Sequence, residues 1–471
     1  MKKKIGLFLG PLLFIIIFCF VEFNELSFNG RAVLASILWI ATWWVTEAIP
    51  IPITSLLPIV LFPLTGGLSI AETVKGYSHP LIFLFIGGFI IAIAIEKCNL
   101  HKRIALNIIS IIGDTKSKII LGVMISSAFL SMWISNTATT VMMLPIGLAI
   151  INHVNDKSKD FNIALMLSIA FSASIGGVAT LIGTPPNLVL AANIQEKFGK
   201  EIGFLEWMYV GLPFSIILLF ILWIYITKIA FNFTDIKKIT PNKSIILVEL
   251  KKLGKMSFNE KVVFVLFIST ILLWLTRKYL QIYISGLNDS IIALISVFVL
   301  FTFPIKKNRV KLITWNDALK LPWGVLLLFG GGITLANGFS ISGLSNWIGS
   351  QFYLLKEFNL ILVLIIIITC VNFLTEITSN MATTSVVLPI LIPLALVLNV
   401  NPIILMTGAT ISASCAYMLP VATPPNAIVF GSNLLKISDM IRVGFWMNIV
   451  SIVIITIITY FFVPIIFYEI I

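Results

Sequence analysis

Charged side chains are scarce in this chain of 471 residues: Lys, Arg, Asp and Glu make up 11% of it, whereas 59% of the residues are hydrophobic. The mean hydropathy is +1.06. A soluble chain of this length has amphipathic helices and more charge. Here many apolar runs approach the roughly 20 residues that a helix needs to cross the hydrocarbon core of a bilayer. The composition therefore excludes a soluble globular protein and predicts an integral membrane protein.

Cysteine and histidine are also rare, and neither forms a cluster. The four cysteines lie in or beside apolar segments without paired spacing, which indicates neither a disulfide framework nor a metal site. The three histidines lie near the ends of apolar runs and are expected to be surface residues. These residues are Cys19, Cys98, Cys370, Cys415, His79, His101 and His153.

The net charge of +12 does not indicate a nucleic-acid partner. Lys and Arg gather in short loops between apolar runs, where they set the orientation of membrane helices. The chain starts with Met1-Lys2-Lys3-Lys4 before an apolar run to Val21, and no small-x-small cleavage site follows. We therefore expect a first membrane helix at about 5–21, a cytoplasmic N-terminus and no binding of nucleic acid.

Two helix-breaking motifs occur twice inside apolar sequence. Ser135-Asn136-Thr137 precedes Gly183-Thr184-Pro185-Pro186-Asn187, and Ser379-Asn380-Met381 precedes Ala422-Thr423-Pro424-Pro425-Asn426. The copies lie 244 residues apart for the first motif and 239 residues apart for the second. Backbone groups freed by Pro and Gly cannot stay unsatisfied against hydrocarbon, so such breaks at membrane depth line a cavity. The pattern predicts a secondary transporter with two structural repeats.

Loop charges indicate how each repeat inserts. Basic residues, such as Lys118 and Lys157, flank both ends of the apolar stretch at about 119–151. This predicts a re-entrant hairpin that enters from the cytoplasm and carries the first motif at its tip. The matching stretch at about 358–398 has no basic cluster at either end, so its hairpin is expected to enter from outside. Oppositely inserted halves are typical of secondary transporters.

The expected fold is an all-α polytopic membrane protein with about 11 transmembrane helices, two re-entrant helical hairpins and an inverted-topology repeat. The expected parts are an N-terminal transmembrane helix (1–30), a first repeat (31–231), a basic cytoplasmic linker (232–261) and a second repeat (262–471). The linker could bind anionic lipid, but cytoplasmic loops carry such charge by default. The C-terminus is expected outside the cell. Expected spans are 5–21, 31–48, 52–66, 80–97, 162–195, 208–230, 262–284, 289–304, 321–337, 403–433 and 443–467, of which 162–195 and 403–433 are broken by the second motif.

Neutral oxygen atoms dominate the motifs. Ser, Thr and Asn side chains, with carbonyls freed at a helix break, suit Na⁺, and the N-termini of half-helices suit an anion. The motifs contain no Lys, Arg, Asp or Glu, so a dianion at the membrane midplane needs bound cations to offset its desolvation. The motifs predict cation-coupled anion transport. They offer no nucleophile, metal cluster or acid–base pair, so we expect no enzyme.

Two acidic residues lie in or beside apolar runs, where ionisable groups are candidates for function. Glu47 follows Trp43 and Trp44 at the end of one run and is expected to form an interfacial ion pair. Glu376 falls between Thr375 and Ser379, and the sequence leaves a structural and a functional role equally open.

At these motifs the chain resembles the divalent anion/sodium symporter family, solute carrier family 13, in which Ser-Asn-Thr hairpin tips and Thr-Pro-Pro-Asn breaks recur in both repeats. The resemblance covers nearly the whole chain. It implies a homodimer in the lipid of the plasma membrane, with a transport part that slides in an elevator movement. It also implies sodium ions as coupling ions and C4-dicarboxylates such as succinate, malate and fumarate as substrates. A sodium-independent exchanger and a sodium-coupled sulfate or citrate transporter of the same fold remain alternatives.

The resemblance also implies two sodium sites and a substrate site between the hairpin tips. The first sodium site resembles Ser131, Ser135 and Asn136 with a carbonyl near Gly183. The second resembles Thr375, Thr378 and Asn380 with a carbonyl near Ala422. The substrate carboxylates would contact Ser135, Asn136, Thr137, Thr184, Ser379, Asn380 and Thr423. Met381 stands where the second tip usually offers Thr, which leaves the preferred anion open.

Overall fold

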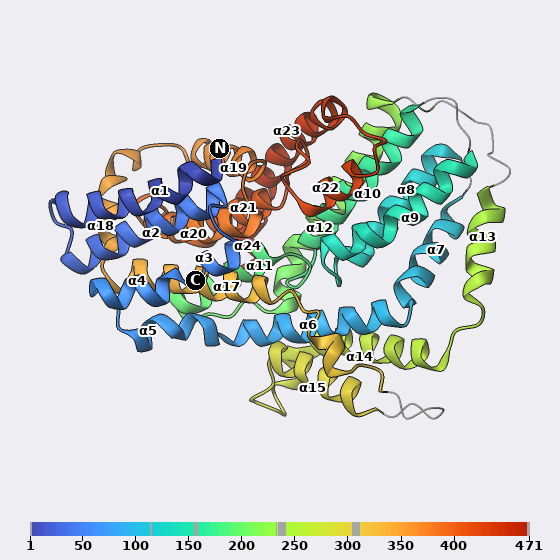
Figure 1. Cartoon of the computed structure of the whole chain (residues 1–471), viewed down its shortest axis with the longest axis horizontal. Helices are drawn as coiled ribbons and strands as arrows, with labels where there is room; N and C mark the ends of the chain where they lie inside the picture. The colour runs from blue at the N-terminus through green and yellow to red at the C-terminus, as the bar shows by residue number, and fades with distance from the viewer. Residues whose placement is uncertain are drawn as a thin grey trace.

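The computed structural model describes residues 2–113, 115–154, 159–231, 233, 242–303 and 311–468. Within these ranges the regular structure is helical and contains no strand, which confirms the prediction of an all-α chain. Lys157 of the first hairpin flank and 234–241 of the linker lie outside the described residues. Figure 1 shows α1, α2 and α18 at one end of the molecule and α8, α7 and α13 at the other.

The helices of the first half are α1 (Lys2–Ile15), η1 (Ile16–Phe20), α2 (Phe28–Thr46), α3 (Ile51–Thr54), α4 (Leu57–Thr65), α5 (Ile70–Lys75), η2 (Gly76–Ser78), α6 (Pro80–Lys97), α7 (Leu100–Ile112), α8 (Lys116–Ser131), α9 (Asn136–Val154), α10 (Lys159–Val178), α11 (Pro185–Phe198), α12 (Phe204–Ile224) and η3 (Tyr225–Ala230). The helix α13 (Asn242–Leu253) follows in the linker.

The helices of the second half are α14 (Phe258–Leu280), α15 (Asp289–Thr302), α16 (Trp315–Ala318), α17 (Trp323–Ile341), α18 (Leu344–Gln351), η4 (Tyr353–Leu355), α19 (Leu360–Thr375), α20 (Asn380–Val397), α21 (Pro402–Ala413), α22 (Pro424–Phe430), α23 (Ile437–Phe461) and α24 (Val463–Ile466).

Eight helices of the described chain are long and apolar enough to cross a membrane, and five apolar helices are shorter. The protein is an integral membrane protein of the polytopic, all-helical class. The most enclosed long helix is α10, in which 94% of an apolar 18-residue window is buried inside the protein, whereas the corresponding share in α14 is 28%. The packing thus separates a central helix from helices whose apolar side chains face outward. The eight helices are Lys2–Phe20, Ile70–Lys97, Lys159–Val178, Phe204–Ala230, Phe258–Leu280, Trp323–Ile341, Asn380–Val397 and Ile437–Ile466.

The two halves repeat small structural details as well as motifs. Ser69 and Glu72 form a capping box at the start of α5, and Thr314 and Asp317 form one at the start of α16, 245 residues later. In a capping box the two residues satisfy each other's free backbone N–H groups.

Asp317 of the second capping box also forms an ion pair, because Lys97 Nζ lies 2.7 Å from its carboxylate. Burial alone would raise the pKa of Asp317, but the hydrogen bonds from Lys97 and Thr314 outweigh it and lower the pKa to about 2.

One expected span is corrected. The segment expected as one span at 52–66 is two helices, because α3 ends at Thr54 and α4 begins at Leu57. The segment predicted as the linker contains the helix α13, and α14 begins at Phe258. The helices α7 and α18 are too short to appear as spans in the hydropathy.

The prediction that the histidines are surface residues was wrong for His79 and His101. His79 and His101 are buried, with 4% and 2% of their surface exposed, while the side chain of His153 lies outside the described part of the chain. Glu47, by contrast, lies 3.7 Å from Lys3 Nζ with both side chains partly exposed, as expected of an interfacial pair. The burial of the two histidines follows from α6 and α7 packing against other helices, which residue type alone does not reveal.

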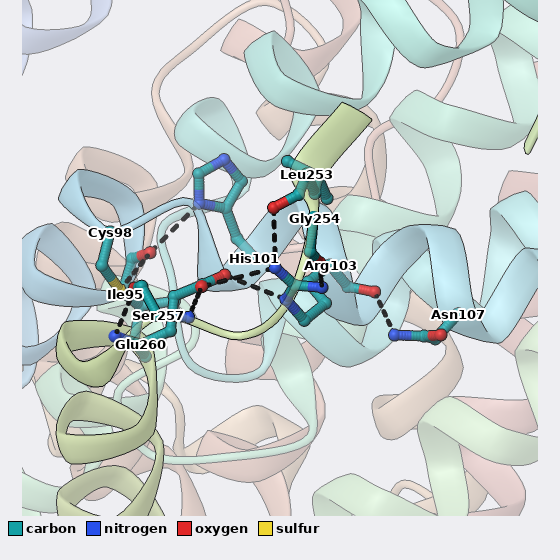
Figure 2. A network of polar contacts seen from close by, with 9 residues as sticks. All are labelled: Ile95, Cys98, His101, Arg103, Asn107, Leu253, Gly254, Ser257 and Glu260. Atoms are coloured by element: carbon teal, nitrogen blue, oxygen red, sulfur yellow. Dashed lines mark hydrogen bonds and ion pairs between the residues drawn. The ribbon is translucent and has the colours of Figure 1, made fainter. Parts of the chain in front are cut away.

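An ion pair connects α7 of the first half to α14, which follows the linker helix α13 (Figure 2). Arg103 Nε of α7 donates to Glu260 Oε1 of α14 at 2.9 Å, and the guanidinium also donates to the carbonyls of Leu253 and Gly254. Nearby, His101 Nδ1 lies 3.2 Å from the Ile95 carbonyl, and burial is the main cause that lowers the pKa of His101. A neutral imidazole donating to this carbonyl fits that position.

Candidate functional site

The helix interruptions fall on the predicted motifs. In the first half α8 ends at Ser131 and α9 begins at Asn136, while α10 ends at Val178 and α11 begins at Pro185. In the second half α19 and α20 are separated by 376–379, and α21 and α22 by 414–423. The sequence explains the positions: Ser379 is the N-cap of α20, and a Pro-Pro pair starts both α11 and α22. Pro is favoured in the first turn of a helix because its missing N–H is not needed there.

The interrupted helices of the two halves pack crosswise. Helix α22, of the second half, packs against α9 and α10 of the first, and α11, of the first half, packs against α20 and α21 of the second. Figure 1 shows α22 beside α10, in line with this packing. Helices α9, α11, α20 and α22 each begin at a motif, so the crossing brings motif-bearing helices together whose first residues lie 288 positions apart (α9 and α22) or 195 positions apart (α11 and α20) in the chain.

Oxygen atoms converge at the first hairpin tip. One terminal atom of the Asn136 amide lies 2.6 Å from Ser131 Oγ, 3.2 Å from the Ala173 carbonyl oxygen and 3.3 Å from the Gly183 carbonyl oxygen. An amide nitrogen at this position donates to both carbonyls. An amide oxygen at the same position completes a ring of neutral oxygens, which is the ligand type that suits a hard monovalent cation. The structure thus brings together Ser131, Asn136 and Gly183.

Glycine makes this convergence sterically possible. A Cβ atom on Gly177 would lie 2.4 Å from Asn136 Oδ1, and one on Gly183 would lie 2.4 Å from the Gly177 carbonyl oxygen. Both distances are shorter than real Cβ contacts. The amide of Asn136 therefore reaches the break after α10 only because these two positions carry no side chain.

The second tip has a matching arrangement. Thr375 Oγ1 lies 2.7 Å from Asn380 Oδ1 and donates to the Ala413 carbonyl oxygen at 2.8 Å. Thr375 and Asn380 are each 244 residues after Ser131 and Asn136, so the hydroxyl-to-amide contact is repeated at the same place. Ala422, the residue expected to supply a carbonyl here, is buried directly before Thr423. The carbonyl that contacts Thr375 is instead that of Ala413.

The other predicted site residues differ in exposure. Thr137 is exposed, and the matching Met381 is buried with 4% of its surface exposed. Ser135 and Ser379 are half-buried, and Ser135 Oγ accepts from the N–H of Ala138. Thr378 Oγ1 donates to the Leu374 carbonyl oxygen and lies 2.6 Å from Thr383 Oγ1, so its hydroxyl is used inside the hairpin.

Thr184 and Thr423 stand at the starts of the two half-helices that follow the breaks. Each has extended backbone and is the N-cap of its helix, α11 or α22. Thr423 Oγ1 accepts from the N–H of Asn426 at 3.3 Å. Both residues are buried. The first turn of the long helix α11 thereby directs free N–H groups and a partial positive charge toward the break.

Two cavities flank this region. One of about 260 Å³ lies beside α11 and α20 and is lined in part by Asn193 and Pro389. The other, of about 520 Å³, lies beside α9 and α13 and is lined in part by Pro145 and Leu253. None of the predicted site residues lines either cavity. The first cavity thus adjoins α11 and α20 of the crossing, and the second adjoins α9.

Comparison with known proteins identifies the family. The family model described as the sodium:sulfate symporter transmembrane region matches residues 2–468. The chain belongs to this family.

Relatives within this family are similar over nearly their full length. A sodium-dependent dicarboxylate transporter of Staphylococcus saprophyticus is 48% identical over 98% of this chain and 92% of its own. A protein of the same description from Staphylococcus aureus is 47% identical with the same coverage.

Solved structures support the fold at low sequence identity. The YdaH transporter of Alcanivorax borkumensis has a TM-score of 0.61 at 11% identity and covers 85% of this chain and 89% of its own. MtrF of Neisseria gonorrhoeae has a TM-score of 0.59 at 14% identity, with 97% and 98% covered. At such identities the likeness concerns the fold of this symporter-family member and not its substrate.

Some residues of this symporter-family site escape prediction from the motifs. Gly177 and Ala413 approach the hairpin tips through their backbone. Any residue type can make a backbone contact, so the sequence does not predict it. Thr180 Oγ1 donates to the Met132 carbonyl oxygen at 2.5 Å, which links the first break to the first tip. A signal exists for Gly177, since Gly176-Gly177 is a glycine pair shortly before a helix break.

Proposed function

We propose that this chain imports C4-dicarboxylates such as succinate, malate and fumarate together with sodium ions. The observation that carries the proposal is the convergence of Ser131, Ala173 and Gly183 oxygens on the Asn136 amide, with the same hydroxyl-to-amide contact at Thr375 and Asn380. Neutral oxygens in this arrangement suit Na⁺. The names of the two staphylococcal relatives support a dicarboxylate as the anion.

In this proposal the first sodium ion is held by Ser131, Ser135 and Asn136 with the Gly183 carbonyl. The second is held by Thr375, Thr378 and Asn380, with carbonyls of the second break, from Ala413 to Ala422, completing its ligands. Paired cations are required because a dianion in a low-dielectric site without a basic side chain keeps a large desolvation penalty.

The dicarboxylate then lies between the two tips. Its carboxylates meet side-chain donors and the positive N-terminal ends of the half-helices, which favour anions. The crosswise packing of α9 with α22 and of α11 with α20 supports this placement, because it gathers the motifs into one region. The residues assigned to the substrate are Ser135, Asn136, Thr137, Thr184, Ser379, Asn380 and Thr423.

We further propose that the protein is a homodimer in the plasma membrane that works by an elevator movement. The hairpin of α8 and α9 enters from the cytoplasm, and that of α19 and α20 enters from outside. The N-terminus is then cytoplasmic and the C-terminus external. Lys116 and Lys118, which lie in the first turn of α8, support this orientation through the positive-inside rule.

Uptake into proteoliposomes tests the function. Radiolabelled succinate should enter with an inward Na⁺ gradient and should not enter when K⁺ or choline replaces Na⁺. Malate and fumarate should compete with it. Equal uptake in all three salts, accelerated by internal dicarboxylate, would favour a sodium-independent exchanger. Competition by sulfate or citrate at lower concentrations than by malate would instead assign a different anion to the same site.

Cysteine accessibility tests the orientation. In a cysteine-free background, a cysteine at Asn152, near the end of α9, should be shielded from an impermeant thiol reagent outside intact cells. A cysteine at Asn399, directly after α20, should be labelled. Both positions are exposed at the protein surface. Labelling of both positions, or of neither, would contradict opposite insertion of the two hairpins.

A further inference from the structure

The interruptions at the two hairpin tips comprise 132–135 and 376–379, and Glu376 is the only charged residue among them. Its side chain is enclosed in the protein, with 3% of the residue exposed. An ionisable group buried at membrane depth needs partners for its charge. The partners of Glu376 show what it does.

The Glu376 carboxylate accepts the N–H groups of three consecutive residues in the second break. Oε1 accepts from Tyr417 at 2.7 Å and from Met418 at 2.9 Å, while Oε2 accepts from Met418 and Leu419 at 3.1 Å each. Asn448 of α23 adds its side-chain Nδ2 to Oε1 at 2.8 Å. Both oxygens are thereby occupied by N–H donors, so the carboxylate braces the backbone and does not ligate a cation itself.

The first repeat is built differently at the same place. There the break between α10 and α11 spans 179–184, whereas the break between α21 and α22 spans 414–423. Met132 stands 244 residues before Glu376, and its backbone carbonyl accepts from the hydroxyl of Thr180. At the position of Glu376 the first repeat thus has a backbone carbonyl that accepts one hydroxyl, whereas the second repeat has a carboxylate that contacts a longer unwound segment.

We propose that Glu376 is the positioning residue of the second sodium site, an inference that rests on the proposed function. By fixing the N–H groups of Tyr417, Met418 and Leu419, it holds the unwound segment so that its carbonyls face the second tip. The Ala413 carbonyl, which accepts from Thr375, lies at the end of α21 directly before this segment. The negative charge of Glu376, one residue from Thr375, also favours a cation nearby in a medium of low dielectric constant.

The first test is the sodium dependence of E376Q. The amide keeps the side-chain size but removes the charge and turns one acceptor oxygen into a donor that faces backbone N–H groups. We expect the Na⁺ concentration for half-maximal succinate uptake to rise about tenfold or more. The succinate KM at saturating Na⁺ should change far less. E376D, which keeps the charge, should recover part of the sodium affinity, whereas M132L at the matching position should leave sodium dependence unchanged.

A second measurement reports on the segment that Glu376 holds, through the reactivity of a buried thiol. Cys415 is fully buried in the unwound segment, and replacement of Cys19, Cys98 and Cys370 by Ser leaves it as the single thiol. E376Q should speed the reaction of Cys415 with N-ethylmaleimide severalfold and should weaken the protection of this thiol by Na⁺. This readout does not depend on transport activity.

The possible results distinguish a failure of the proposed function from a failure of the role assigned to Glu376. A wild type without sodium-dependent dicarboxylate uptake contradicts the proposed function, whereas unchanged sodium affinity and Cys415 labelling in a folded E376Q contradict only the role of Glu376. Equal losses of sodium and succinate affinity would also overturn it. If E376Q does not give a monodisperse protein, the sodium dependence of N448A is measured instead, because this variant removes one hydrogen-bond donor to the Glu376 carboxylate. We expect from it a smaller sodium shift in the same direction, and wild-type sodium dependence would overturn the proposal.

Discussion

Asn187 and Asn426 hold the two helix breaks in the same way. They lie 239 residues apart, and each donates its side-chain Nδ2 to backbone carbonyls seven and ten residues before it. For Asn187 the acceptors include Gly177 and Thr180, with distances of 3.3 and 2.8 Å. Both side chains are fully buried. The last residue of each Thr-Pro-Pro-Asn motif thus satisfies carbonyls that the broken helix leaves free.

Replacement of either asparagine by Ala should destabilise the fold. Each variant removes the side-chain donor to the buried carbonyl of Gly177 or Ala416, whereas the carbonyls of Thr180 and Leu419 still accept from the N–H groups of Gly183 and Ala422. A buried unsatisfied group costs about 1–3 kcal/mol. The thermal unfolding midpoint of purified N187A and N426A should fall in a lipid or detergent environment. N107A is the control, since Asn107 is exposed on α7 and donates only to the Arg103 carbonyl within its own helix. Unfolding midpoints equal to that of the wild type would show that the side-chain hydrogen bonds of Asn187 and Asn426 do not contribute to stability.

Asn136 and Asn380 should be required for sodium coupling. N136A and N380A each remove the amide that meets the hydroxyl of Ser131 or Thr375. We expect each to reduce sodium-dependent succinate uptake to background while the protein stays folded. N107A again serves as the matched asparagine control. Uptake at the wild-type rate by either variant would place the cation sites elsewhere.

Met381 and Thr137 provide a reciprocal pair for the substrate. The two residues lie 244 positions apart, one buried and one exposed. We expect M381T to raise the apparent affinity for succinate and T137M to lower it, with sodium dependence retained in both. A hydrogen bond to a charged group contributes about 1.5–3 kcal/mol, so each change is on the order of tenfold. Unchanged competition profiles in both variants would show that neither position faces the anion.

The Arg103–Glu260 pair should contribute to stability across the two repeats. Both side chains are largely buried, at 15% and 6% exposed, and removal of one partner of a buried pair costs about 3–5 kcal/mol. R103M and E260Q should each lower the thermal midpoint by several degrees, and the double variant should lose less than the sum of the two. Additive losses would show that the two groups do not stabilise each other.

Much of the fold follows from the sequence, because its signals are local. Long apolar runs and the Pro-Pro pairs at the starts of α11 and α22 are visible residue by residue, and they predict helices and breaks directly. The helices α7 and α13 are harder to predict, since both are short and carry charged residues. Their positions depend on contacts such as that between Arg103 and Glu260, which join parts of the chain 157 residues apart.

The candidate site divides in the same way. Side chains such as Ser131, Asn136 and Asn380 could be named from the motifs, whereas the Ala173 and Ala413 carbonyls could not, because any residue supplies a carbonyl. The role of Glu376 needed coordinates as well. A lone acid in an apolar run can bind a cation or brace a backbone, and only its five N–H contacts separate the two.

The most direct test of the account is the movement of sodium itself. Proteoliposomes with equal Na⁺ on both sides, traced with radioactive ²²Na⁺ outside, receive an inward succinate gradient. Two matched oxygen clusters that hold sodium beside the dicarboxylate predict accumulation of ²²Na⁺ driven by succinate, and its loss in both N136A and N380A. Entry of succinate without any increase in ²²Na⁺ uptake would contradict sodium coupling at these sites.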